Sequence, residues 1–332
     1  MTSKQFFEKV VVLGTGGTIA GTATQAGDNI GYTAAQVGVD QLLAFIPGLS
    51  DLLSGRLLVT EQVAQINSKD MSFMLWQQLA LRVNHYLEQP DVKGVVITHG
   101  TDTLEETAYF LHAALPTSLL LRKPVVLTCA MRPASSVAPD GPQNLMDAVA
   151  VVVTPGACGV VAVCAGALHG AVEVQKIYPY RLDAFNSGDA GPLGYIEEGH
   201  VRRVRSWPIT FVPPIGGARP IFEKIVKASH WPRVEIVMNY AGASGGVVDA
   251  LVKTAGQVDP VRGLVVAATG NGTVHCDLEA ALIRAQAAGV VVVLATRCIM
   301  GRVLPRSDAV FQDSQGLSPV KARVALMLAL MP

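Results

Sequence analysis

Two threonines, each placed just after an apolar run, are the residues of this chain best suited to do chemistry. Thr15 follows the run Val10–Leu13, and Thr101 follows the run Val95–Thr98, with Asp102 directly after it. A threonine hydroxyl is a weak nucleophile that requires a neighbouring base or a depressed pKa. Two hydroxyls with a carboxylate nearby therefore suggest acyl transfer through a threonine nucleophile.

The first threonine belongs to a glycine-rich turn, Gly14-Thr-Gly-Gly-Thr18, whose residues do not fit the common nucleotide-binding motifs. The dinucleotide fingerprint would need glycine where the chain has Ile19, and the P-loop would need a lysine that the segment lacks. A tight turn of this kind can present backbone N–H groups to an anion, as an oxyanion hole does. The same glycines are also compatible with a purely structural turn after a strand.

Each of the other candidate residues has a structural alternative. Thr101–Thr103 precedes Glu105 and a helical pattern, where such residues commonly form an N-cap. Ser68 precedes another helical pattern in the same way. Lys176 is a single lysine after the fourth apolar run, and a lone lysine is more often a solvated surface group. No single motif decides between catalysis and structure.

Short apolar runs supply the strands that must position these residues. Several are apolar at consecutive positions, as strands covered on both faces must be. Amphipathic segments lie between many of them, with examples at Met71–Glu88, Glu105–Leu115 and Pro142–Val152. This alternation predicts an α/β fold with a doubly wound, mostly parallel sheet, whose ligands bind at the carboxyl ends of the strands. The runs are Val10–Leu13, Val95–Thr98, Val125–Thr128, Val160–Val163, Glu235–Met238, Leu264–Ala267 and Val290–Leu294.

The alternation of strands and helices lapses between about 183 and 232, in a region rich in Gly, Pro and Arg. Within it, the stretch that begins at Tyr195 predicts one hairpin, because a turn is flanked by β-capable residues. We therefore predict a larger N-terminal domain at 1–205, a linker at 206–229 and a smaller α/β C-terminal domain at 230–332.

The segment from Gly16 to Tyr32 is predicted to be a long structureless loop beside the end of the first strand. It is rich in glycine and threonine and has no apolar periodicity. Loops of this kind at a strand terminus often act as lids, although a surface loop without a function has the same composition.

Composition argues against some classes of partner. Lys+Arg and Asp+Glu are both 26, so the formal net charge is zero and no basic face is implied for nucleic acid or an anionic membrane. A net charge near zero also suits a chain whose surface is partly covered in an oligomer. The stretch Ala148–Val172 lacks charged residues, but Thr154–Gly156 interrupts it. We interpret it as a helix end, a turn and a buried strand rather than a membrane span.

The five cysteines form no Cys-x-x-Cys pair, and we expect small buried residues in a reducing compartment rather than metal ligands or a disulfide. The first nine residues are too short and too charged for a signal peptide. These observations favour a cytoplasmic protein.

Together, the motifs resemble those of the bacterial-type L-asparaginase/glutaminase family. The chain contains the family's Thr-Gly-Gly-Thr-Ile-Ala-Gly signature at Thr15–Gly21 and its Thr-His-Gly-Thr-Asp-Thr signature at Thr98–Thr103. The resemblance spans nearly the whole chain. Further matching segments are Glu105–Leu111, Ala130–Pro133, Asp140–Pro142, Gly191–Tyr195, Gly270–Gly272 and Pro319–Arg323.

The resemblance implies a catalytic role for five of the candidate residues. Thr15 is implied as the nucleophile that attacks the side-chain amide carbon of the substrate, and Tyr32 as the phenol that contacts and helps activate it. Thr101, Asp102 and Lys176 are implied as a second cluster, in which the lysine lowers the cost of deprotonating Thr101.

The resemblance also implies how the substrate is held. Asp102 would bind the α-ammonium group, Ser68 the α-carboxylate, and backbone groups near Ala130 the departing amide nitrogen. Lys69 stands where members of the family often have Gln or Glu. A cation there would attract the substrate carboxylate but repel the α-ammonium group, so we expect weaker or altered substrate selection.

The implied assembly is a homotetramer made of two intimate dimers. In it, Thr273 and, by a looser match, Asp308 of one C-terminal domain would complete the site of a neighbouring subunit. The implied reaction converts L-asparagine to L-aspartate and ammonia, with L-glutamine as a candidate lesser substrate, and uses no cofactor or metal. A glutaminase-asparaginase preferring glutamine and a non-catalytic amino-acid sensor on the same fold are the alternatives. The disulfide of secreted members has no counterpart here.

Overall fold

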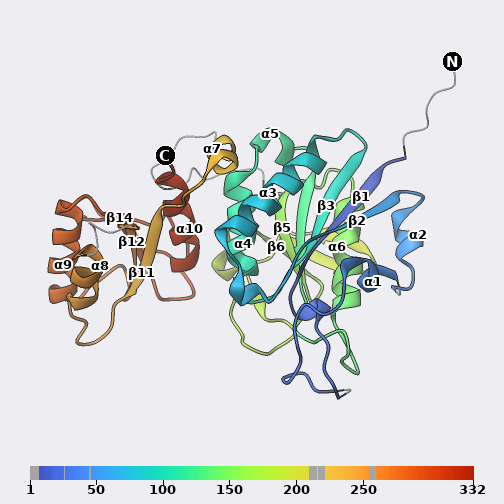
Figure 1. The fold of residues 1–332 in the computed structure, drawn as a ribbon, viewed down its shortest axis with the longest axis horizontal. Coiled ribbons are helices and arrows are strands. Elements are labelled where there is room, and N and C mark those ends of the chain that lie inside the picture. The colour runs from blue at the N-terminus through green and yellow to red at the C-terminus, as the bar shows by residue number, and fades with distance from the viewer. Residues whose placement is uncertain (1–6, 26, 45, 209–214, 216–220, 254–258) are drawn as a thin grey trace. The chain divides into compact units, whose positions relative to one another are not determined.

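The chain divides into two compact units, Met1–Phe211 and Val212–Pro332, which are drawn in Figure 1. Of the predicted linker, residues 209–214 and 216–220 lie outside the described residues. Helix α7 (Phe222–Lys227) occupies part of the remainder, and the predicted domain boundaries stay a prediction. The computed structural model describes residues 7–25, 27–44, 46–208, 215, 221–253 and 259–332.

The N-terminal unit is built on one sheet, whose order is β10-β9-β6-β5-β4-β3-β1-β2. The pairs β2–β1, β1–β3, β3–β4 and β4–β5 are parallel. The pairs β5–β6, β6–β9 and β9–β10 are antiparallel. The predicted hairpin is confirmed as the pair β9 and β10. The strands, in sheet order from the parallel edge, are β2 (Leu57–Ile66), β1 (Lys9–Gly16), β3 (Val92–Thr98), β4 (Pro124–Thr128), β5 (Gly159–Cys164), β6 (Ala167–Gly170), β9 (Gly194–Glu197) and β10 (His200–Arg203).

Helices cover both faces of this sheet, which explains why its central strands are apolar at consecutive positions. Figure 1 shows α3 and α4 on one side and α1, α2 and α6 on the other. Val10 and Val12 belong to the core on the second side, while Val11 and Leu13 are equally buried and alternate with them. The helices are α1 (Val39–Ala44), α2 (Leu49–Leu53), α3 (Phe73–Glu88), α4 (Leu104–Ala114), α5 (Thr117–Leu120) and α6 (Gly141–Val153).

Short elements at the ends of the strands complete the N-terminal unit. Three are 3₁₀ turns and two form a small antiparallel ladder. They are η1 (Thr18–Ala20), η2 (Ser68–Asp70), η3 (Gly188–Ala190), β7 (Gln175–Lys176) and β8 (Phe185–Asn186).

The C-terminal unit contains a smaller parallel sheet of order β11-β12-β13-β14. Helices α8 and α9 pack on one face, and α10 packs on the other. The predicted fold class, two α/β parts with mostly parallel sheets, is confirmed. The elements are β11 (Arg233–Met238), α8 (Gly246–Lys253), β12 (Val261–Ala268), α9 (Cys276–Ala287), β13 (Val291–Thr296), β14 (Gln312–Asp313) and α10 (Pro319–Ala329).

Two sequence-based expectations are corrected by the structure. The segment from Gly16 to Tyr32 is not structureless, because η1 lies within it and Thr22 forms a β-bridge with Thr33. Cys129, Cys158 and Cys164 are buried as expected, but Cys276 and Cys298 are exposed. Both exposed cysteines lie where the chain leaves the core: Cys276 begins α9, and Cys298 follows the end of β13.

The charge-free stretch Ala148–Val172 is divided among the end of α6, a turn, β5 and β6, as the sequence predicts. Among the described residues, no helix combines the length and apolar character that crossing a bilayer requires.

Candidate active site

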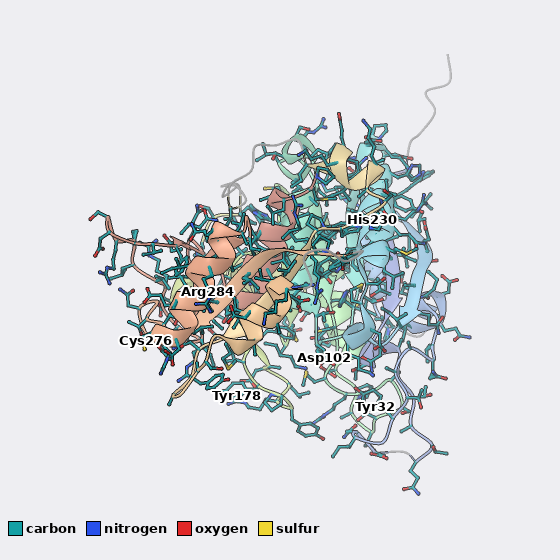
Figure 2. The ribbon with its side chains drawn as sticks, turned by 60° about the vertical axis from the view of Figure 1, so that its left-hand side comes forward. Tyr32, Asp102, Tyr178, His230, Cys276 and Arg284 are labelled. Atoms are coloured by element: carbon teal, nitrogen blue, oxygen red, sulfur yellow. The ribbon has the colours of Figure 1, made fainter. Side chains whose placement is uncertain are left out.

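The order of the parallel strands places both threonine motifs at one edge of the sheet. The chain proceeds from β1 to β2 on one side and then returns to lay β3 on the other side of β1. Ligands of open α/β sheets bind at the carboxyl ends of the strands beside such a reversal. The Thr15 and Thr101 motifs follow β1 and β3 at this position. Figure 2 shows Asp102 and Tyr32 at the same end of the N-terminal unit.

The two motifs touch through their glycines. A Cβ atom added to Gly17 would lie 2.4 Å from the Cα atom of Gly100, so no side chain fits between them. Gly17 also has φ +81°, a conformation that L residues with side chains rarely adopt. The glycine at position 17 is therefore required for the approach of the two motifs.

The Thr15 side chain is buried, and its hydroxyl donates a hydrogen bond of 2.8 Å to the main-chain carbonyl of Thr98. This bond links the end of β1 to the end of β3. A carbonyl oxygen accepts a hydrogen bond but does not remove a proton at neutral pH. For Thr15 to act as a nucleophile, its hydroxyl must therefore turn from Thr98 toward a base.

Tyr32 contacts a different hydroxyl from the one that the family resemblance implies. Its phenol forms a hydrogen bond of 2.6 Å with Oγ1 of Thr18, in the turn η1, whereas the hydroxyl of Thr15 bonds to Thr98. No role was inferred for Thr18 from the sequence. The sequence feature that could have identified Thr18 is its place in the same signature as Thr15, three residues further along the chain.

Lys176 joins Thr101 and Asp102 in one cluster. Its ammonium group donates hydrogen bonds of 2.8 Å to Oγ1 of Thr101 and 2.7 Å to Oδ1 of Asp102. The lysine is mostly buried and the carboxylate is half exposed, with 18% and 52% of their side chains accessible. A cation on the threonine oxygen favours its deprotonated form. The carboxylate keeps an exposed oxygen for a cationic ligand.

Ser68 lies against the same cluster. The backbone N–H of Asp102 donates to its hydroxyl oxygen at 3.3 Å, and the hydroxyl of Thr103 donates to its carbonyl at 2.8 Å. A carboxylate and a hydroxyl side by side offer opposite partners for the ammonium and carboxylate of an amino acid. Lys69 is 66% exposed and lies 3.7 Å from Asp70, so it faces solvent rather than the buried part of the cluster.

The remaining candidate residues fall into two places. Ala130 follows β4 and is fully buried in the N-terminal unit. Thr273 and Asp308 lie in the C-terminal unit, where both line one cavity of about 550 Å³. Thr273 bonds to Thr269 across a tight turn, and Asp308 forms an ion pair of 2.6 Å with Arg306.

A buried histidine, His99, is hydrogen-bonded within the Thr101 motif. His99 has no solvent exposure, and its Nδ1 lies 2.8 Å from the carbonyl of Gly100, which can only accept a hydrogen bond. Nδ1 therefore carries the proton, and Nε2 accepts from the hydroxyl of Thr107 at 3.0 Å. Trp76 donates to the same hydroxyl at 2.9 Å. The chain of bonds holds the neutral imidazole in one tautomer.

Burial makes His99 a source of acid sensitivity. Desolvation lowers its pKa from 6.5 to about 4, because the charged form has lost its hydration, although the bond to Gly100 partly opposes this. Above pH 6.5 the ring is neutral in both the folded and unfolded states. Between pH 6.5 and 4 only the unfolded state binds the proton, so stability falls as the pH falls.

We expect the free energy of unfolding of the wild type to fall by about 3 kcal/mol more than that of His99→Gln between pH 6.5 and 4. Urea denaturation at a series of pH values measures this difference. His200→Gln, which changes an exposed histidine, should keep the wild-type slope. Equal slopes for the wild type and His99→Gln would contradict the prediction.

One group of metal-ligand types occurs among the described residues. The ligand atoms of His275, Cys276 and Asp277 lie within 4.8 Å of one another at the start of α9. His275 already accepts the N–H of Asp277 as the N-cap of that helix. The positive end of a helix also disfavours a cation, so the trio has a structural explanation.

Comparisons with known proteins agree with this geometry. Residues 9–208 match the family model described as "Asparaginase, N-terminal", and residues 233–331 match the "Glutaminase/Asparaginase C-terminal domain". L-asparaginase 2 of Escherichia coli (strain K12) is 36% identical over 330 residues, covering 97% of this chain and 88% of that protein. Glutaminase-asparaginase of Pseudomonas fluorescens biotype A is 34% identical over 336 residues, covering 99% of this chain and 88% of that protein.

Solved structures lead to the same family. A crystal structure described as a probable cytoplasmic L-asparaginase from Campylobacter jejuni has a TM-score of 0.84 and 35% identity to this chain. The match covers 97% of this chain and 95% of that one. The family resemblance inferred from the two threonine signatures is confirmed. Both characteristic domains are matched, and the two threonine motifs lie together at the carboxyl ends of the parallel strands. This chain belongs to the asparaginase family.

Proposed function

We propose that this protein is an L-asparaginase, an amidohydrolase that converts L-asparagine to L-aspartate and ammonia. The observation that carries the proposal is the cluster in which Lys176 bridges Thr101 and Asp102 beside the Thr15 turn. Family membership supports the same reaction. Ammonia release from asparagine by the purified chain tests it, and the absence of release would overturn it.

Substrate binding follows from the charges of the cluster. The exposed oxygen of Asp102 accepts the α-ammonium group of asparagine, and the Ser68 hydroxyl donates to its α-carboxylate. The side-chain amide then lies toward the Thr15 turn. The backbone around Ala130 is proposed to accept a hydrogen bond from the amide nitrogen that departs.

The reaction is proposed to proceed through an ester on Thr15. Its oxygen attacks the amide carbon, and backbone N–H groups of the turn other than that of Gly17, which donates to the carbonyl of Ile66, stabilise the oxyanion. The C–N bond breaks as the nitrogen takes up the proton that Thr15 has lost, and ammonia leaves. Water then hydrolyses the aspartyl ester. Tyr32 must move from Thr18 to Thr15 to assist the first step, so closure of the segment that carries Tyr32 is part of the proposal.

Direct attack by water activated at Thr101 is the competing route. It is favoured by one observation, because Lys176 contacts Thr101 whereas Thr15 bonds to a carbonyl. Rapid quenching followed by mass spectrometry distinguishes the routes. An aspartyl adduct on Thr15 supports the ester route, and its absence during turnover supports direct attack.

Glutamine is the second candidate substrate. The Pseudomonas fluorescens relative is a glutaminase-asparaginase, and one extra methylene changes transition-state binding by only about 1–3 kcal/mol. Separate kinetics with asparagine and glutamine decide the preference. A non-catalytic sensor is disfavoured, because binding alone requires only the ammonium and carboxylate partners and not two supported hydroxyls.

Lys69→Gln is expected to lower the KM for asparagine by about twofold to fivefold. The lysine charge repels the substrate ammonium near Asp102, but its exposure limits the interaction to at most about 1 kcal/mol. Steady-state kinetics measure the change. Lys93→Gln, near the amino end of β3 and thus at the far end of the strand, is the matched control. An unchanged KM for asparagine in Lys69→Gln would contradict the prediction that the Lys69 charge weakens substrate binding.

We further propose a cytoplasmic homotetramer in which Thr273 and Asp308 complete a neighbouring subunit's site. The cavity shared by these two residues supports a binding role for that face. All five cysteines are free, and the Campylobacter jejuni relative is described as cytoplasmic, which supports the location. Sedimentation equilibrium, which gives the mass of the native particle, tests the assembly.

A further inference from the structure

The segment that follows β4 is held by two side chains from the start of α6. Asp140 accepts the N–H groups of Met131 and Arg132, each at 2.9 Å, through its two carboxylate oxygens. Asn144 donates to the carbonyl of Cys129 at 2.9 Å. These bonds surround Ala130, the residue whose backbone is proposed to contact the departing nitrogen.

Each of these bonds orients one peptide plane. In a trans peptide the C=O and N–H point in opposite directions within one plane. Because the N–H of Met131 points to Asp140, the carbonyl of Ala130 must point away from it. Because the carbonyl of Cys129 points to Asn144, the N–H of Ala130 points away from Asn144. Both peptide planes of Ala130 are thus fixed by side chains of α6.

Asn144 is itself held by further hydrogen bonds. It is buried, its Oδ1 accepts from the N–H of Ala165 at 3.0 Å, and its Nδ2 also donates to Asp140 at 3.3 Å. The start of α6 also packs directly on the segment, since a Cβ atom added to Gly141 would lie 3.5 Å from the Cβ of Ala130. Hydrogen bonds of Asp140 and Asn144 therefore connect the ends of β4 and β5 to the start of α6.

We infer that Asp140 and Asn144 are positioning residues, which aim the Ala130 carbonyl at the N–H of the departing amide nitrogen. The inference rests on the proposed amidohydrolase function. A capping role alone would explain a bond from Asp140 into its own helix. It would not explain why both carboxylate oxygens and the Asn144 amide bond to three consecutive peptide groups around Ala130.

The inference makes a prediction that depends on the leaving group. The amide nitrogen of asparagine carries hydrogens that the Ala130 carbonyl can accept. The methoxy group of L-aspartate β-methyl ester carries none. In the ester reaction water replaces methoxide, which leaves as methanol after taking up a proton, and the same acyl carbon reacts. A misdirected carbonyl should therefore impair amide hydrolysis and spare ester hydrolysis.

The test measures kcat/KM for asparagine and for the methyl ester with Asp140→Asn. We expect the asparagine value to fall about 10-fold to 100-fold, as misplacement of a substrate-positioning group commonly costs. The ester value should change less than about threefold. Asn144→Ala, which leaves Asp140 in place, should lower the ratio of amide to ester activity in the same direction. Thr154→Val is the matched control, because Thr154 bonds to Ala150 at the opposite end of α6 and should leave the ratio unchanged.

The ester reaction also shows that each variant is folded. If both variants lose amide and ester activity in equal proportion, or keep both, the inference is overturned. If the wild type hydrolyses neither substrate, the proposed function fails instead. A wild type active on both substrates with an unchanged ratio in the variants therefore rejects the positioning role alone.

Discussion

Replacing Thr15 with alanine should reduce the kcat for ammonia release from asparagine by at least about 1,000-fold. In the proposed ester route Thr15 supplies the oxygen that forms the acyl bond, and no backbone group can take its place. The proposed substrate-binding residues Asp102 and Ser68 remain in place, so KM should change far less than kcat. A coupled ammonia assay with asparagine and glutamine, each measured separately, gives both constants.

Thr15→Ser provides the matched comparison for this variant. It keeps the hydroxyl and removes only a methyl group from a buried site, so it should retain measurable turnover. A folded Thr15→Ala protein that keeps full turnover would show that another group attacks the substrate. The candidate would then be water activated at Thr101.

Replacing Lys176 with methionine should lower kcat by about 100-fold to 10,000-fold. The ammonium group contacts the oxygen of Thr101 at 2.8 Å, and methionine fills a similar volume without the charge. Loss of the cation makes deprotonation of the threonine less favourable. We therefore expect the remaining activity to require a higher pH than the wild type, which a pH–rate profile measures.

The β7–β8 pair, which carries Lys176, also offers a control residue. Arg181 lies in the loop between β7 and β8 and forms an exposed ion pair with Asp183. Arg181→Met should leave kcat within about twofold, because the charge that it removes is exposed and is paired with Asp183 rather than with Thr101 or Asp102. If Lys176→Met and Arg181→Met behave alike, Lys176 has no catalytic part.

The strands differ in how far the sequence predicts them. β1, β3, β4 and β5 are buried on both faces and therefore form continuous apolar runs in the sequence. The edge strand β2 has no such run, because polar residues such as Glu61 and Gln62 interrupt its apolar positions and most of its side chains are half-exposed. β2 forms a strand because it pairs with β1, and its composition alone does not identify it.

Contacts between distant segments were less predictable than the motifs. The Tyr32 phenol was assigned to Thr15 by resemblance, yet the structure places it on Thr18. Two hydroxyls three residues apart in one signature cannot be distinguished by residue type. Only the path of the chain after β1 decides which of them the phenol reaches.

By itself the sequence determined the chemistry that is available and the elements that carry it. Hydroxyls, a carboxylate and a lysine occur at fixed positions, and local hydrophobic patterning predicts a subset of the strands and helices. These are β1, β3, β4, β5, β11, β12 and β13 with helices α3, α4 and α6. The tertiary structure alone decided which groups meet. It places Gly17 against Gly100 and Lys176 on Thr101, 75 residues away along the chain. Such contacts depend on the order of the strands, which arises from packing over the whole sheet and leaves no mark in the residues nearby.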